Sequence, residues 1–233
     1  MSGIFQKELS HYFKTPIGYI FIAVFLVITG AYFFMVNLVS QNGDIKAFFS
    51  SIFTLLMFLI PILTMGLFSE EKKQNTDQLL LTAPVSITAV IVGKFLSTMV
   101  VFALPLGVTL AYPAVLAAFG AFEPMVTVGN YLGILLLGSA FVALGLFISV
   151  LTENQLVAAV VTYAALLILF LSDSAKAVAP PPLQSLLGFI SLTGHYQAFT
   201  YGVLNPADII FYLSTTSLFL FLSVYMLESK RIA

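Results

Sequence analysis

The chain has 233 residues, of which 60% are apolar and only 8% are charged, and its formal net charge is −1. Ordinary globular domains carry roughly a quarter charged residues, so this composition excludes a soluble protein and predicts a polytopic membrane protein. The absence of cysteine excludes disulfides, thiol catalysis and cysteine metal sites.

The first fourteen residues have an amphipathic pattern at helical spacing. Ile4, Phe5 and Leu9 fall largely on one side, and Lys7 and Lys14 fall on another. We expect residues 1–14 to form an interfacial helix along the membrane, with an unstructured cytoplasmic tail as the alternative. The apolar run that follows is too long for the core of a cleaved signal peptide and is predicted to be a retained anchor.

Six apolar runs are long enough to cross a bilayer, which takes roughly 20 helical residues. They are Ile17–Val39, Phe48–Phe68, Ala89–Ala118, Gly129–Leu151, Leu156–Leu171 and Ile209–Leu227. Pro105 and Pro113 interrupt the unusually long third run, which we expect to be bent, tilted or broken. Glycine and alanine residues in the fourth and fifth runs favour close helix packing within one subunit.

Residues 172–208 are neither a span nor an ordinary loop. Prolines at 180–182 predict a rigid turn or a short polyproline segment, and Leu183–Leu192 is apolar but too short to cross a bilayer. Short re-entrant helices that dip into the outer leaflet fit this extracytoplasmic connection, and so does an amphipathic lid on the outer surface. Asn205-Pro206-Ala-Asp208 is a helix start signal for the sixth span.

The distribution of basic residues predicts the orientation of the chain. With a cytoplasmic N-terminus, the outer loops contain only Lys46 and Lys176, and the cytoplasmic parts contain Lys7, Lys14, Lys72, Lys73, Lys94, Lys230 and Arg231. This bias and the even number of spans predict that both termini are cytoplasmic.

The segment 70–86, which this orientation places in the cytoplasm, is unusually polar for this chain. Asn75 and Gln78 have the spacing of a capping box, and Pro84 prevents the helix from continuing. Leu79–Leu81 give this helix an apolar side. We therefore expect a short cytoplasmic helix between the second and third spans that serves as a contact surface.

No group of residues in the sequence is typical of an enzyme. His11 and His195 lie on opposite sides of the membrane in this topology and cannot share a metal ion. The chain has no phosphate-binding loop. No charged residue falls at the centre of a span, which disfavours an ion-coupled transporter, and Lys94, Glu123 and Glu153 are expected to reach the interface from span ends. Energy is therefore expected from another subunit; a passive channel or a membrane scaffold is the alternative, and an intramembrane enzyme is a third.

The polar segment carries a family likeness. Glu70-Glu71-Lys72-Lys73-x-x-Thr76-x-x-Leu79-Leu80-Leu81-Thr82-x-Pro84-Val85-Ser86 resembles the cytoplasmic loop between the second and third spans of ABC-2 type transporter permeases. The opening Phe5-x-Lys7-Glu8-Leu9, the stretch Gly93-Lys94-Phe95 and the tail from Leu227 to Arg231 are similar to other parts of that family. The compact length and the end segments look most like the gliding-motility-type subgroup.

The resemblance implies an all-α membrane protein with one transmembrane domain over residues 1–233 and no catalytic activity. In this family the loop helix is a coupling helix that docks in a groove of a separate ABC ATPase, which holds the ATP and Mg²⁺. The residues implied in coupling are Glu70, Glu71, Asn75, Thr76, Asp77, Gln78, Leu79, Leu80, Leu81, Thr82 and Pro84.

The resemblance also implies partners and a location. A second permease subunit, identical or different, would complete the membrane part, and an auxiliary subunit with a large extracytoplasmic domain can accompany it. Membrane lipid is a further partner and nucleic acid is not. The implied location is the bacterial inner membrane, and the implied role is ATP-driven export or movement of an extracytoplasmic partner.

Overall fold

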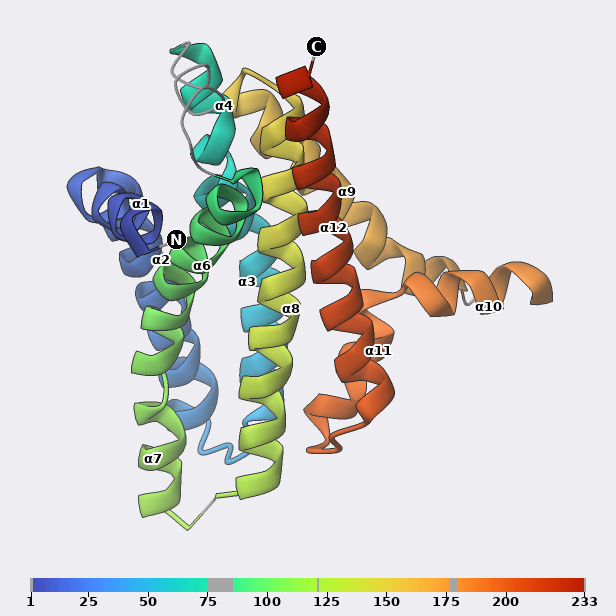
Figure 1. The fold of residues 1–233 in the computed structure, drawn as a ribbon. Helices are drawn as coiled ribbons and strands as arrows, with labels where there is room; N and C mark the ends of the chain where they lie inside the picture. Colours follow the sequence, from blue (N-terminus) through green and yellow to red (C-terminus); the bar gives the residue numbers. More distant parts are fainter. Residues whose placement is uncertain (1, 75–85, 121, 177–179, 233) are drawn as a thin grey trace.

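The computed structural model describes residues 2–74, 86–120, 122–176 and 180–232, and every regular element in these residues is helical (Figure 1). In this part of the chain, six helical segments are long and apolar enough to cross a membrane. The predicted number of spans is confirmed. Some ends of the spans match the predicted residues and others differ, as described below.

The chain begins with helix α1 (Ser2–Lys14), which confirms a helix where an interfacial one was predicted. Thr15 is extended, and Pro16 starts α2 (Pro16–Tyr32) in a position where its missing N–H has no helical partner to lose. A π-helix, η1 (Phe33–Val39), completes the first span at the predicted residue. The position of α1 relative to a membrane remains a prediction.

The second span combines α3 (Lys46–Thr64) with α4 (Gly66–Lys73), and it continues past the predicted end at Phe68. The third span is broken between α6 (Ile87–Val108) and α7 (Ala111–Ala118), so the expected interruption is present. Pro113 explains the place of the break, because it cannot donate to the carbonyl of Thr109 and its ring excludes a regular helix there.

The second half of the chain is formed by α8 (Pro124–Leu151), α9 (Gln155–Lys176) and α12 (Pro206–Ile232), with two short helices before α12. α8 starts before the predicted Gly129, and α9 runs past the predicted Leu171. The start signal of the last span is confirmed, since Asn205 Oδ1 accepts a hydrogen bond from the Ala207 amide at 3.1 Å.

The connection before α12 contains α10 (Pro181–Ile190) and α11 (Leu192–Thr200). Pro180 is extended and caps α10. α10 projects sideways from the bundle, whereas α11 turns back along it (Figure 1). Short helices were expected in this connection, and their placement, in the outer leaflet or as a lid on the outer surface, remains a prediction.

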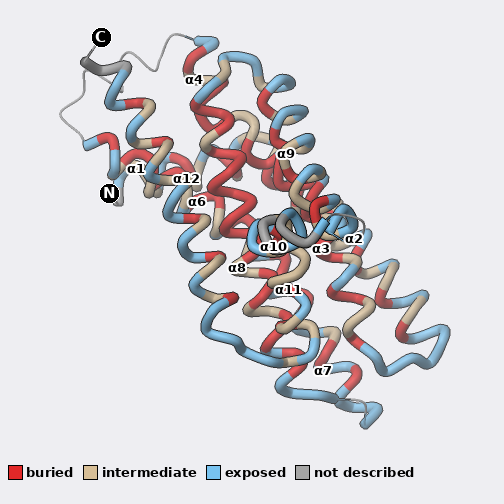
Figure 2. Tube along the Cα trace, turned by 90° about the vertical axis from the view of Figure 1, so that its right-hand side faces the viewer, coloured by how far each residue is buried: buried red, intermediate tan, exposed pale blue. Residues whose placement is uncertain are grey.

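The core lies around α8. In the apolar stretch of this helix 78% of the residues are buried, against 22% for α9 and 17% for α12. Figure 2 shows buried residues through the middle of the bundle and exposed ones along the outer sides of α9 and α12. The outer helices therefore present apolar side chains to their surroundings, as lipid contact requires.

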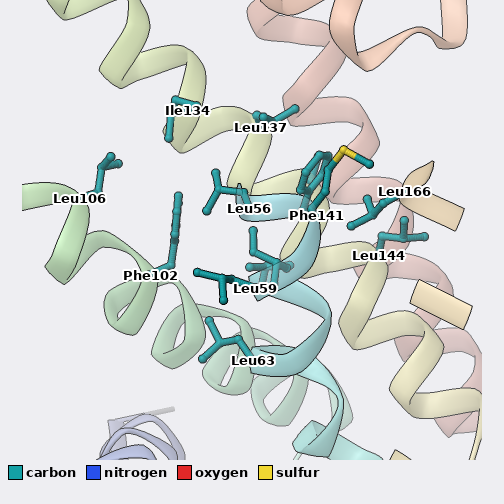
Figure 3. Packing of buried hydrophobic residues seen from close by; sticks show 14 of the residues in the cluster. Leu56, Leu59, Leu63, Phe102, Leu106, Ile134, Leu137, Phe141, Leu144 and Leu166 are labelled. Carbon is teal, nitrogen blue, oxygen red and sulfur yellow. The ribbon is translucent and has the colours of Figure 1, made fainter. Parts of the chain in front are cut away.

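Glycines allow α8 to approach its neighbours closely, as predicted. A Cβ atom at Gly138 would overlap the ring of Phe102 in α6, and one at Gly145 would overlap Thr64 Oγ1 in α3. In Figure 3, Phe102 lies in one apolar cluster with side chains from α3, α6, α8 and α9. The small residues of α8 thus serve packing inside this chain.

Candidate functional site

The candidate site lies at the end of the bundle that carries α1 and α4, where the C-terminal part of α12 also lies (Figure 1). α4 contains Glu70 and Glu71, and α6 begins at Ile87, on the other side of residues 75–85. Ser86 caps α6 by accepting a hydrogen bond from the Ala89 amide at 3.3 Å. This cap fixes the start of the helix that follows residues 75–85, and the contacts of α4 are described next.

α4 is joined to α8 through Ser149. A regular helix would pair the Ser69 amide with the Met65 carbonyl, but Ser149 Oγ lies between them. It accepts from the Ser69 amide at 3.1 Å and donates to the Met65 carbonyl at 3.1 Å, and it also accepts from the Phe68 amide at 2.9 Å. A side chain inserted in this way interrupts a helix, which accounts for the boundary between α3 and α4.

Lys72 makes a second connection between α4 and α8. Its side chain is buried, and Nζ donates to the carbonyl of Val150. The last carbonyls of a helix lack donors within the helix and carry the negative end of its dipole. A lysine at this position supplies both a donor and a positive charge, so α4 is fixed to the C-terminal end of α8.

Lys94 of α6 occupies the centre of a buried group of charges, which we call the Lys94 cluster (Lys94, Glu8 and Glu71). The Lys94 side chain is only 2% exposed, and Nζ lies 3.0 Å from Glu71 Oε1 and 3.1 Å from Glu8 Oε1. It also donates to the Leu67 carbonyl at 2.8 Å. An ammonium group has three donors, and these three acceptors come from α1 and α4, so the cluster connects both helices to α6.

Lys7 balances the charge of the Lys94 cluster, which contains two carboxylates and one ammonium group. Its Nζ lies 3.9 Å from Glu71 Oε1, and its side chain is 70% exposed. An exposed pair at this distance contributes little to stability. The buried contacts of Lys94 therefore hold the cluster together.

Tyr12 anchors α1 beside the Lys94 cluster. Its hydroxyl donates to the Leu63 carbonyl at 3.1 Å and lies 3.0 Å from Thr98 Oγ1, which links α1 to α3 and α6. Burial raises the pKa of Tyr12 well above its ordinary value, so the hydroxyl stays protonated. At Gly93 a Cβ atom would lie 3.0 Å from a methyl group of Ile4, so the glycine lets α1 approach α6.

A cavity of about 670 Å³ lies between α1 and α4. Tyr12, Ile17, Leu63 and Leu67 supply apolar walls. Charged and polar side chains from both helices also line it: Lys7, Glu8, His11, Lys14, Glu70, Glu71, Gln74 and Lys94.

The comparison with protein families decides the class of the chain. The model of the family described as "ABC-2 family transporter protein" matches residues 4–228. The chain belongs to this family. A search among curated proteins finds no match.

Membership makes the chain a membrane protein of the ABC-2 transporter family and implies a permease subunit of an ABC transporter. Such subunits are generally non-catalytic, and in this family they generally work with an ABC ATPase and pair with a second permease. In the described part of the chain, no group of three or more His, Asp or Glu side chains could hold a metal ion. His195 is instead paired with Asp208 of α12, at 2.5 Å.

Only two of the predicted coupling residues of this ABC-2 permease lie in the described structure. Glu71 belongs to the Lys94 cluster, and Glu70 lines the cavity and accepts from Gln74 Nε2 at 3.5 Å. The others lie outside the described residues: Asn75, Thr76, Asp77, Gln78, Leu79, Leu80, Leu81, Thr82 and Pro84.

The interpretation of Lys94 as an interfacial anchor was wrong. Lys94 points into the bundle rather than toward its surface, because Glu8, Glu71 and the Leu67 carbonyl together satisfy its charge and its donors. Glu8 was not identified as a functional residue either. The sequence did contain a signal, since Glu8 lies four residues from both Ile4 and Tyr12 and therefore shares their buried side of α1.

Proposed function

We propose that the chain is the permease subunit of an ABC transporter of the bacterial inner membrane, with α4 and both termini in the cytoplasm. A separate ABC ATPase binds ATP and Mg²⁺ and docks on the segment 70–86. The location of α1, α4 and the last turns of α12 at one end of the bundle supports a common side for the two termini (Figure 1).

The observation that carries this proposal is the attachment of α4 to three other helices. Glu71 is bound to Lys94 of α6 at 3.0 Å, Lys72 is bound to the end of α8, and Lys94 also binds Glu8 of α1. Because α4 leads directly into residues 75–85, a displacement of this segment would move α4 together with the helices that it contacts. Rigid-body motion of packed helices is an established form of coupling between protein states.

The coupled motion would act on a pair of permease subunits, identical or different. It drives either export of a substrate or movement of an extracytoplasmic partner held by an auxiliary subunit. The absence of charged residues at the centres of the spans is compatible with both. Resemblance to the gliding-motility-type subgroup supports the second form. Transport into vesicles and stimulation of the ATPase by candidate substrates distinguish the two.

Co-purification with the cognate ATPase tests the docking surface. Replacing Leu79 and Leu80 with Asp places charges on the apolar side of the predicted coupling helix, and we expect loss of co-purification while membrane insertion is retained. Leu204→Asp is the control, because Leu204 is exposed in the turn between α11 and α12. Retained co-purification of the double variant would contradict the docking role.

A further inference from the structure

The cavity between α1 and α4 separates opposite charges on two walls. The α1 wall carries Lys7, His11 and Lys14, and the α4 wall carries Glu70 with Gln74 beside it. In the interior, Lys94 is already satisfied by Glu8 and Glu71. Lys7 balances the second carboxylate through Glu71, so the charges that remain at the mouth are Lys14 on the α1 wall, with His11 beside it, and Glu70 on the α4 wall.

The cavity also lies at the boundary between the polar and apolar parts of the chain. Its apolar wall includes Ile17, in the first turn of α2, and Leu63, in the last turn of α3, and both belong to candidate membrane spans. α1 lies outside the candidate spans and supplies the cationic groups. Lipid headgroups occupy the same boundary in a bilayer, and amphipathic helices such as α1 lie there.

Exposed apolar side chains on α2 and α3, the helices that supply Ile17 and Leu63 to the cavity, are available to acyl chains. Ile20, one helical turn after Ile17, is 55% exposed, and Ile62, which precedes Leu63, is 48% exposed. A soluble anion would use only the charged mouth, whereas a lipid would also cover these side chains. The cavity thus combines a charged mouth with exposed apolar side chains on the adjoining helices α2 and α3, as a site for a lipid headgroup requires.

We propose that this cavity binds the headgroup of an amine-bearing zwitterionic phospholipid. The phosphate contacts Lys14 and His11 on the α1 wall, and the ammonium group donates to Glu70 on the α4 wall. A phosphatidylglycerol headgroup has no ammonium group and would leave Glu70 beside an anion. This site goes beyond the proposed coupling function and does not depend on it, because its lining residues belong to one chain.

Native mass spectrometry of the purified full chain in detergent tests the proposal with three probes: dioleoylphosphatidylethanolamine, dioleoylphosphatidylglycerol and soluble O-phosphoethanolamine. We expect retention of the ethanolamine lipid to exceed that of the glycerol lipid by about tenfold, the effect of one charge-assisted hydrogen bond. Soluble O-phosphoethanolamine should be retained far less, because it lacks acyl chains. Equal retention of the two lipids would overturn the proposal. Retention of soluble O-phosphoethanolamine equal to that of the ethanolamine lipid would also overturn it.

Variants of lining residues, compared with variants of nearby residues outside the cavity, test whether the lipid binds in this cavity. Lys14→Gln and Glu70→Gln should each lower retention of the ethanolamine lipid by about tenfold, whereas Lys73→Gln and Glu153→Gln should leave it unchanged. Lys73 and Glu153 are exposed near the same end of the bundle but do not line the cavity. All four changes are at positions that are not buried, so the variants are expected to fold. Retention by Lys14→Gln and Glu70→Gln equal to that of the controls would overturn the proposed site.

Discussion

Lys94 Nζ lies 3.1 Å from Glu8 Oε1, and this contact joins the third span to the first helix of the chain. The two residues are far apart in the sequence, and both are buried. Glu71 approaches the same ammonium group from α4. One cation therefore holds α1, α4 and α6 together where the proposed coupling segment begins.

Removing the cation of the Lys94 cluster should destabilise the permease strongly. Lys94→Met leaves the Glu8 and Glu71 carboxylates without their buried partner, and the loss of one member of a buried pair costs about 3–5 kcal/mol. Thermal unfolding in detergent should show a decrease in the melting temperature on the order of 10 °C. The exposed Lys73→Met serves as control.

Removing the two carboxylates of the cluster as well should restore the stability that Lys94→Met loses. Combining Lys94→Met with Glu8→Gln and Glu71→Gln removes all three charges, so we expect the melting temperature to recover most of the loss. A single variant Lys94→Met as stable as the parent chain would show that the cluster does not hold the helices together.

Ser149→Ala should weaken the attachment of α4 to α8. The variant deprives the Phe68 and Ser69 amides of a buried acceptor, and each unsatisfied buried group costs about 1–3 kcal/mol. Hydrogen exchange at α4 should become faster than in the parent chain. Ser214→Ala is the matched control, because the exposed Ser214 donates only to a carbonyl of its own helix. Unchanged exchange at α4 would mean that Ser149 does not fix this helix.

Gly138→Ala tests the close packing of α8 on α6. The new methyl group would overlap the Phe102 ring, and overpacking of this kind costs about 1–3 kcal/mol. In contrast, Gly107→Ala adds a methyl group with no neighbour within 4 Å, and higher helix propensity should leave stability equal or improved. Melting temperatures that do not separate the two variants would contradict the packing in Figure 3.

Hydropathy predicted the six spans because each is a long apolar run, and their number follows from length and composition alone. The ends were less predictable. The second span was expected to stop at Phe68 because charges follow, yet α4 continues to Lys73. Lys72 can stay buried there because the end of α8 offers the Val150 carbonyl, a contact that no local pattern contains.

The candidate site was predicted only in part, because some of its contacts join helices that are far apart in the sequence. The motif located the segment 70–86, and the structure places Glu71 beside Lys94. Lys94 looked like an interfacial lysine because it lies near the start of a span, and only the fold shows that Glu8 reaches it from α1. Long-range pairs of this kind depend on helix packing, so periodicity along one helix could not predict them.

The cysteine-free chain permits a direct test of topology. Single cysteines at Ser40 and Thr76 follow the first span and the second span, and an odd number of crossings separates them. A membrane-impermeant thiol reagent should therefore label Ser40→Cys from the outside and Thr76→Cys only from the cytoplasmic side. Labelling of both from the same side would contradict the orientation.

Cross-linking of Thr76→Cys to the cognate ATPase tests the proposed coupling contact most directly. In the assembled complex, a short thiol-to-amine cross-linker should join Thr76→Cys to the ATPase and leave Ser40→Cys without a cross-link to it. If Thr76→Cys forms no cross-link while the complex remains intact, the segment 70–86 is not the docking surface.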